Sequence, residues 1–159
     1  MFRNTPRLAA IAALVLALTV TARIAPAAGD GPLPTSEDKP FAEAFILLQL
    51  SDGDDAKQNA VLDVANNLIK HYGGPDMVDI EIVAFGPGMQ LLLEDNPRAD
   101  RIASLVENGV RFVGCMNTVD TMERKTGTRP ALNEHTIPVQ TGVAHVVDRV
   151  RQGYVLVRP

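Results

Sequence analysis

The strongest constraint on the fold is a regular alternation of short apolar runs with stretches of helical periodicity, which begins at Ala42 and continues to the C-terminus. The apolar runs predict strands. Five segments carry this pattern: Ala44 to Leu50, Val78 to Phe85, Val110 to Gly114, Ile137 to Val139 and Tyr154 to Val157. Helical patterns fill the intervals: Asp55 to Tyr72, a short Met89 to Leu93, Asn96-Pro97 to Asn108, Thr118 to Lys125, and a helix between Thr141-Gly142 and Gly153.

Strands that alternate with helices imply βαβ crossovers, since parallel strands need a long connection between them. We therefore expect an α/β fold, a three-layer α/β/α sandwich of Rossmann-like type around a mostly parallel sheet of about five strands. The pattern leaves the strand order open. In the last helix, Val143, Val146, Val147 and Val150 are expected to face inward.

Ligands of open parallel sheets bind at the carboxyl ends of the strands. Three segments follow predicted strands directly and define the candidate rim: Ser51–Asp54, Gly86–Gly88 and Cys115–Thr118. The site is therefore expected where these segments meet.

Cys115 is the candidate catalytic residue of this rim, just before a predicted helix that Asn117 or Thr118 would cap. Helix N-terminal amides stabilise an anion and favour the thiolate, which is the nucleophilic form. The alternative is an inert, buried cysteine, because free cysteine is among the most buried residue types. Position alone leaves both interpretations open.

The remaining motifs favour structural roles. Gly86-Pro87-Gly88 lacks the third glycine and the lysine of phosphate-binding loops and suits a tight strand-to-helix turn. His71, His135 and His145 do not have a metal-ligand spacing, and His135 is disfavoured as a base for the thiol. Ser51–Asp54 lacks the twelve-residue calcium pattern and suits a turn and helix cap. We expect no metal site and no cofactor.

The N-terminus predicts export. Arg3 and Arg7 precede an apolar run from Leu8 to Val20, and Ala25-Pro26-Ala27 supplies the small residues of a cleavage site. We expect a signal peptide over residues 1–27, a flexible Pro/Gly-rich linker over residues 28–40 and a periplasmic mature domain over residues 41–159. The apolar run is shorter than the roughly 20 residues of a membrane-spanning helix, which disfavours the alternative of an uncleaved anchor, so no membrane association is expected after cleavage.

The net charge and the number of cysteines disfavour nucleic-acid binding and exclude an internal disulfide. Removing residues 1–27 from the 159 leaves 132 residues with 12 basic and 19 acidic side chains, a net charge of −7. An acidic domain without a cluster of basic residues is expected to bind nucleic acid poorly. Cys115 is the single cysteine, so no internal disulfide can form. In an oxidising compartment, an unpaired thiol is expected to be either buried in the structure or part of the protein's chemistry.

Several segments resemble the DsrE/DsrF-like family of small sulfur-metabolism proteins: IVAFGPGMQLLLEDNP, ENGVRF, VGCMNT and the terminal GYVLVRP. The resemblance covers residues 41–159. It implies a compact α/β/α fold that assembles as a trimer or hexamer. It also implies a persulfide-carrying cysteine, at the position of Cys115, that passes sulfur between partner proteins.

Two hypotheses follow. In the first, the protein is a periplasmic sulfur carrier or sulfurtransferase-type protein in which Cys115 accepts sulfane sulfur from a donor and passes it to an acceptor protein. In the second, it is a non-catalytic oligomeric binding or assembly module in which Cys115 only packs. A fold alone does not decide between them. Both include a homo-oligomer, which the apolar helix 143–150 also favours.

Overall fold

The structure is a computed structural model that describes Met1 and residues 39–159. The predicted signal peptide beyond Met1, and the predicted linker up to residue 38, lie outside the described residues. Within the described part of the chain, no helix is both long enough and apolar enough to cross a membrane.

The domain is built on one parallel five-stranded sheet with the strand order β4-β3-β2-β1-β5. The strands are β1 (Ala44–Leu50), β2 (Val78–Ala84), β3 (Arg111–Cys115), β4 (Thr136–Val139) and β5 (Val155–Val157). The register places Ile46 beside Ile80 and Val155, so β1 is flanked by the second and last strands of the chain. All five predicted strands are present within one or two residues of their expected bounds.

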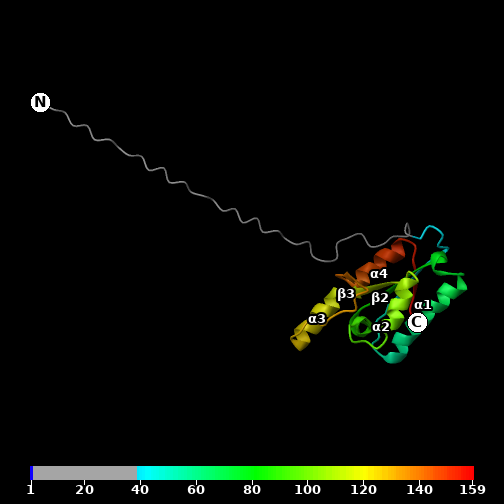
Figure 1. Cartoon of the computed structure of the whole chain (residues 1–159), viewed down its shortest axis with the longest axis horizontal. Helices are drawn as coiled ribbons and strands as arrows, with labels where there is room; N and C mark the ends of the chain where they lie inside the picture. The colour runs from blue at the N-terminus through cyan, green and yellow to red at the C-terminus, as the bar shows by residue number, and fades with distance from the viewer. Residues whose placement is uncertain (2–38) are drawn as a thin grey trace.

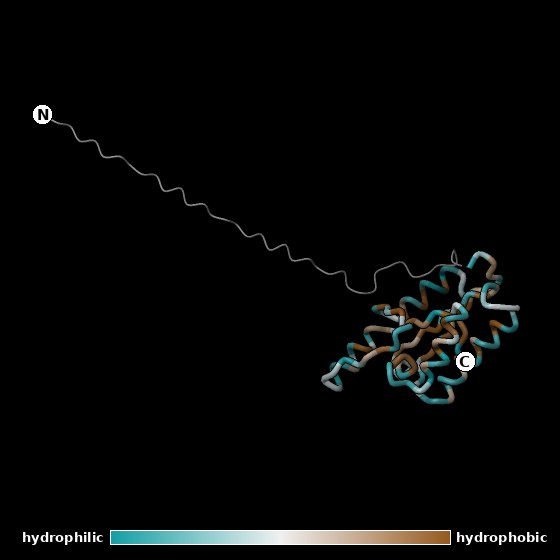
Figure 2. The backbone as a smooth tube through the Cα atoms, in the orientation of Figure 1, coloured by the Kyte–Doolittle hydropathy of each residue, from teal (hydrophilic) through white to brown (hydrophobic). Residues whose placement is uncertain are grey.

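One face of the sheet carries most of the helical structure. It comprises α1 (Asp55–His71), the short 3-10 helix η2 (Pro75–Met77), the 3-10 helix η3 (Gly86–Leu92), α2 (Ala99–Glu107) and α3 (Met116–Thr126). The larger hydrophobic core lies here, around Leu48, Ile82 and Phe112. Figure 2 shows the apolar segments gathered in the interior of the domain, and Figure 1 shows α3 extending from one end of it.

The opposite face is covered by α4 (Gly142–Arg151). A smaller core of Leu47, Val83, Val113, Val146 and Tyr154 lies under this helix. Helices therefore lie on both faces, and the predicted three-layer α/β/α sandwich is confirmed. Because only five buried residues form this core, a helix of ten residues is sufficient to cover it.

The orientation predicted for α4 was wrong for three of its four valines. Val146 is buried, but Val143, Val147 and Val150 are 53%, 43% and 44% exposed. His145 and Arg149 occupy the inward positions beside Val146. They do so because their side chains bind the carboxylate of Glu81 on β2, a partner that the periodicity of the helix does not reveal.

The start of α2 also differs from the prediction. The segment expected to begin at Asn96-Pro97 becomes helical only at Ala99, because Asn96 Oδ1 accepts a hydrogen bond from Arg98 N (3.0 Å) in a local turn. The cap of α1 is as expected: Asp54 Oδ1 accepts from Lys57 N at 2.9 Å.

Candidate functional site

The three predicted rim segments meet at the carboxyl edge of the sheet. Gly86 N donates a hydrogen bond to Thr118 Oγ1 at 3.0 Å, which joins the end of β2 to the start of α3. A Cβ added to Gly53 would lie 3.0 Å from Pro87 O, so the loop after β1 packs directly on the same turn. The edge is therefore continuous across β1, β2 and β3.

The Gly86-Pro87-Gly88 turn is a packing element. A Cβ on Gly88 would lie 2.2 Å from Leu50 O, so glycine lets the start of η3 approach the end of β1. Gly86 has φ +55°, in the left-handed region that glycine adopts most readily. The amide of Gly86 donates to Thr118 and is therefore not available to bind a phosphate. This geometry agrees with the predicted tight turn.

Cys115 itself occupies the N-cap position of α3, which begins at Met116. The expectation that Asn117 or Thr118 caps the helix was wrong. The Thr118 hydroxyl binds Gly86 N, and the Asn117 side chain binds Gln140 Nε2 (2.6 Å) and Thr141 Oγ1 (3.0 Å). These side chains tie α3 to its neighbours and leave its first turn without a side-chain cap.

The thiol of Cys115 is enclosed. The residue is 6% exposed, and its Sγ lies 3.8 Å from the carbonyl oxygen of Gln140. A Cβ on Gly142 would lie 3.0 Å from Cys115 Cβ, so glycine lets the start of α4 pack against the cysteine. Access to Sγ would require this contact between the β4–α4 connection and α3 to open.

None of the three histidines is placed to act as a base for the Cys115 thiol. Among the described residues no hydrogen bond joins a histidine to Cys115. His145 is bound to Glu81 Oε2 at 2.8 Å, and the ring of His135 lies 3.9 Å from Glu134. His71 lies at the exposed end of α1.

The acidic loop after β1 forms local contacts. Asp54 caps α1, and Asp52 binds Arg158 at 3.0 Å. The hydrogen bond from Arg158 holds the pKa of Asp52 below its usual value. Within the described ranges, no group of three or more His, Cys, Asp or Glu side chains is placed to hold a metal ion.

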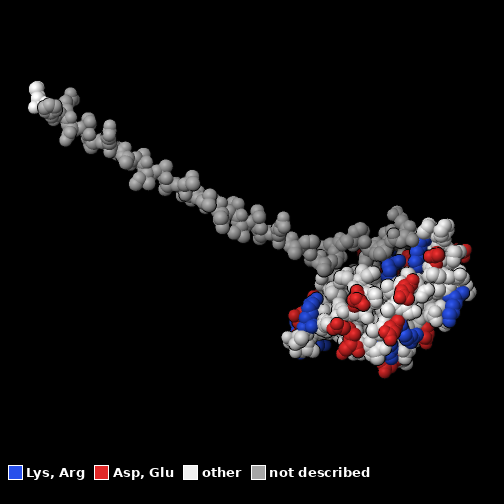
Figure 3. Space-filling view, viewed as in Figure 1, with Lys and Arg blue, Asp and Glu red and all other residues white. Residues whose placement is uncertain are grey.

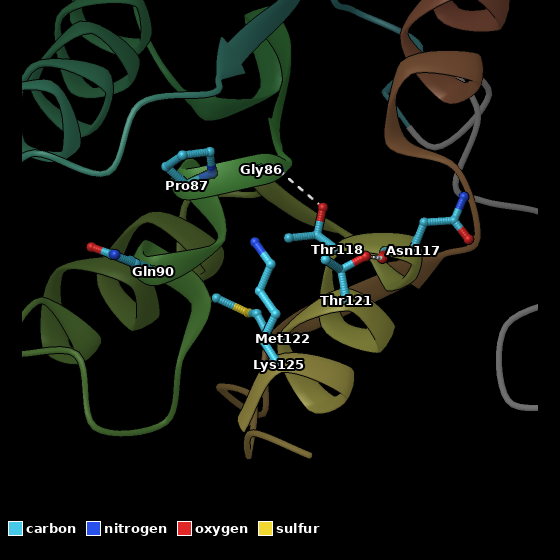
Figure 4. A pocket seen from close by; sticks show the side chains of 8 residues that line it. All are labelled: Gly86, Pro87, Gln90, Asn117, Thr118, Thr121, Met122 and Lys125. Carbon is cyan, nitrogen blue, oxygen red and sulfur yellow. Dashed lines mark hydrogen bonds between the residues drawn. The ribbon is translucent and has the colours of Figure 1, made fainter. Parts of the chain in front are cut away.

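A pocket of about 390 Å³ lies beside this edge, between η3 and α3 (Figure 4). Its lining is mostly apolar, and Cys115 is not part of it. The lining residues are Gly86, Pro87, Gln90, Asn117, Thr118, Thr121, Met122 and Lys125. Four of these residues lie outside the predicted rim segments: Gln90, Thr121, Met122 and Lys125. The helical spacing of Thr118, Thr121, Met122 and Lys125 was the available signal, since residues three and four apart share one face of a helix.

A buried ionic network under α4 was also missed. Arg111 on β3 donates to Glu81 Oε1 (3.0 Å) and to Asp79 Oδ2 (2.9 Å). Arg149 donates to both oxygens of Glu81, at 2.6 and 3.1 Å, and the hydroxyl of Tyr154 donates to Asp79. Polar residues at alternate positions of β2, a strand buried on both faces, were the signal for this network.

Opposing effects act on the pKa of Glu81. Burial raises it, whereas the hydrogen bond from His145 and the charges of Arg111 and Arg149 lower it, and the net result is a pKa below the usual value. Glu81 is therefore a charged group at neutral pH with paired cations around it, and it anchors α4 to the sheet.

The comparisons with known proteins support the fold. No protein-family model matches the sequence, and no curated protein matches it. A solved structure of a protein of unknown function from Methanobacterium thermoautotrophicum is similar, with a TM-score of 0.66 and 26% identity. The match covers 74% of this chain and all of that protein. The chain thus shares a Rossmann-like α/β fold with this protein.

Proposed function

We propose that the protein is a non-catalytic homo-oligomeric module that associates through the outer surface of α4. The observation that carries this proposal is the stripe of Val143, Val147 and Val150 on the solvent side of the helix. These residues follow the i, i+4, i+7 spacing of one helix face. A contiguous apolar stripe on a soluble domain is typical of a protein interface.

The proposed occupant of this surface is a second copy of the chain. A two-fold axis brings the same patch of two subunits together, and a straight apolar helix stripe is complementary to itself in an antiparallel pair. Asp148 and Arg151 flank the stripe with opposite charges, and their contact within one helix is long, at 3.6 Å. In an antiparallel pair each of them can meet its opposite in the partner.

β5 carries a further exposed apolar residue on the same side of the sheet. Leu156 on β5 is in register with Leu47, on the side of the sheet that α4 covers, and it is 44% exposed. The resemblance to DsrE/DsrF-like proteins supports assembly as well, as a trimer or hexamer in that family. The enclosed position of Cys115 is consistent with a packing role in such a module.

Light scattering tests the assembly. We expect a mass that is a multiple of the monomer, and a monomer for Val147→Asp, because an aspartate in the stripe would be buried without a partner. Asn67→Asp adds the same charge to an exposed position of α1 and is the control. A wild-type monomer at micromolar concentration would refute the proposal.

Sulfur carriage through Cys115 is the second candidate, supported by its place at the carboxyl edge and at the N-terminus of α3, where backbone amides stabilise a thiolate. The Cys115 thiolate would attack the terminal sulfur of a polysulfide. One S–S bond forms and one breaks, and the shortened polysulfide leaves with the electron pair. Opening of the Gln140 contact must come first.

Native-state thiol titration followed by mass spectrometry separates the two candidates. Reaction of Cys115 only after unfolding favours the packing role. Gain of one sulfur atom after incubation with polysulfide, absent in Cys115→Ser, favours sulfur carriage. N-terminal sequencing of the secreted protein tests the proposed periplasmic location, with a first residue at or near Ala28 expected.

A further inference from the structure

The pocket between η3 and α3 has the size and surface of a small-molecule site. Its volume of about 390 Å³ lies within the range of roughly 300–1,000 Å³ that is usual for ligand sites. The ring of Pro87 and the thioether of Met122 form part of its wall. An apolar body of a few carbon atoms fits such a surface.

One cation faces this apolar space. Figure 4 shows Lys125 extending from α3 with its ammonium group directed toward the space between Pro87 and Thr118, whereas the side chain of Asn117 points away. Among the described residues, Lys125 has no ion pair and no side-chain hydrogen bond. An ammonium group beside an apolar wall favours a ligand that brings a negative charge.

The other charged side chains of α3 form contacts with protein groups. Asp120 and Glu123 both bind Arg129 at 2.8 Å, and Arg124 donates to Thr121 Oγ1 at 2.7 Å. Lys125 is therefore the charged residue of α3 that lines the pocket.

Gln90 lies on the opposite wall, but Figure 4 shows its side chain directed away from Lys125, and a Cβ added to Gly53 would lie 3.2 Å from its Cδ. Its backbone carbonyl accepts from Asn96 Nδ2 at 2.8 Å, but within the described part of the chain its side-chain amide has no hydrogen-bond partner. Lys125 is therefore the charged group that a ligand in this pocket would meet, beside the apolar side chains of Pro87 and Met122.

We propose that this pocket binds a small organic acid, with its apolar body against Pro87 and Met122 and its carboxylate at Lys125. Sulfur chemistry and self-association are not needed for this site. It adds a ligand to the assembly role proposed above and stands or falls separately from it.

NMR titration of the isotopically labelled protein with hexanoate tests the site, with hexanol and hexylammonium as probes of the same chain length. We expect saturable shifts of the amides of Gly86, Gln90 and residues 118–125, at least about fivefold weaker binding of hexanol, and no saturation with hexylammonium. Lys125→Gln should weaken hexanoate binding about tenfold and leave hexanol binding unchanged, because only the charge contact is lost.

Lys70→Gln is the matched control, since Lys70 is also an exposed lysine in the last turn of a helix. It should bind hexanoate like the wild type. Equal affinity of wild type and Lys125→Gln, equal binding of hexanol and hexanoate, or shifts spread over the surface instead of the pocket would overturn the proposal. Val147→Asp, tested in parallel, should change the mass of the assembly and leave hexanoate binding intact.

Discussion

Replacing Glu81 by glutamine should destabilise the domain strongly without changing the shape of the side chain. The Glu81 carboxylate is completely buried and accepts hydrogen bonds from Arg111 and from two nitrogens of Arg149. Glutamine keeps one acceptor oxygen and turns an NH2 group toward these donors. A hydrogen bond to a charged group contributes about 1.5–3 kcal/mol, and breaking a buried ion pair costs about 3–5 kcal/mol.

Loss of two charged hydrogen bonds therefore predicts a decrease of about 3–5 kcal/mol in the free energy of unfolding. For a domain of this size, this corresponds to a decrease in Tm of about 10–20 °C. Urea denaturation and calorimetry of Glu81→Gln against the wild type measure both values. Glu134→Gln is the control, because the side chain of Glu134 is 88% exposed. A loss below about 1 kcal/mol for Glu81→Gln would refute the assignment of this network as the anchor of α4.

The pH dependence of the two proteins gives an independent check. Because the pKa of Glu81 is lowered in the folded state, its contribution is complete above the unfolded pKa of about 4.3 and is lost as the pH falls through the folded pKa. The difference in stability between wild type and Glu81→Gln should therefore be constant near pH 7 and shrink below about pH 4. A difference that stays the same down to pH 3 would contradict a charged Glu81.

Three further predictions concern backbone packing, backbone conformation and helix capping. Gly88→Ala should cost about 1–3 kcal/mol in urea denaturation, because its Cβ meets the backbone of Leu50. At Gly127 the space is open and only the positive φ of +77° opposes a side chain, so Gly127→Ala should cost about 1 kcal/mol. Asp54→Ala should cost about 1 kcal/mol through loss of the bond to Lys57 N, and an unchanged urea midpoint would contradict this capping role.

The strands, most of the helices and the fold class could be predicted from the sequence because their signals are local, whereas the strand order could not. β1 is a continuous apolar run, and α1 is bounded by a capping aspartate and by Gly73-Gly74, so neither depends on distant partners. The carboxyl edge follows from the parallel sheet. These features act over a few residues and can be read in order along the chain.

The candidate site was predicted less well because its contacts are long-range. Glu81, which lies 64 residues from His145 in the sequence, determines which face of α4 packs against the sheet. The positions of the valines alone predict the wrong face. The start of α3 depends on Gln140 and Thr141, which draw the side chain of Asn117 away from a capping role. The pocket needs the placement of η3 against α3, which neither segment reveals alone.

The pairing of β5 with β1 has a consequence for synthesis. β1 acquires its second neighbour only when residues 155–157 have been synthesised, after the other strands of the sheet. The last residues also reach the β1–α1 region, where Arg158 binds Asp52 and Lys57 Nζ donates to the carbonyl of Pro159 at 2.8 Å. A nascent or truncated chain therefore exposes one edge of β1, and a ribosome-stalled chain that lacks β5 should remain protease-sensitive along that strand.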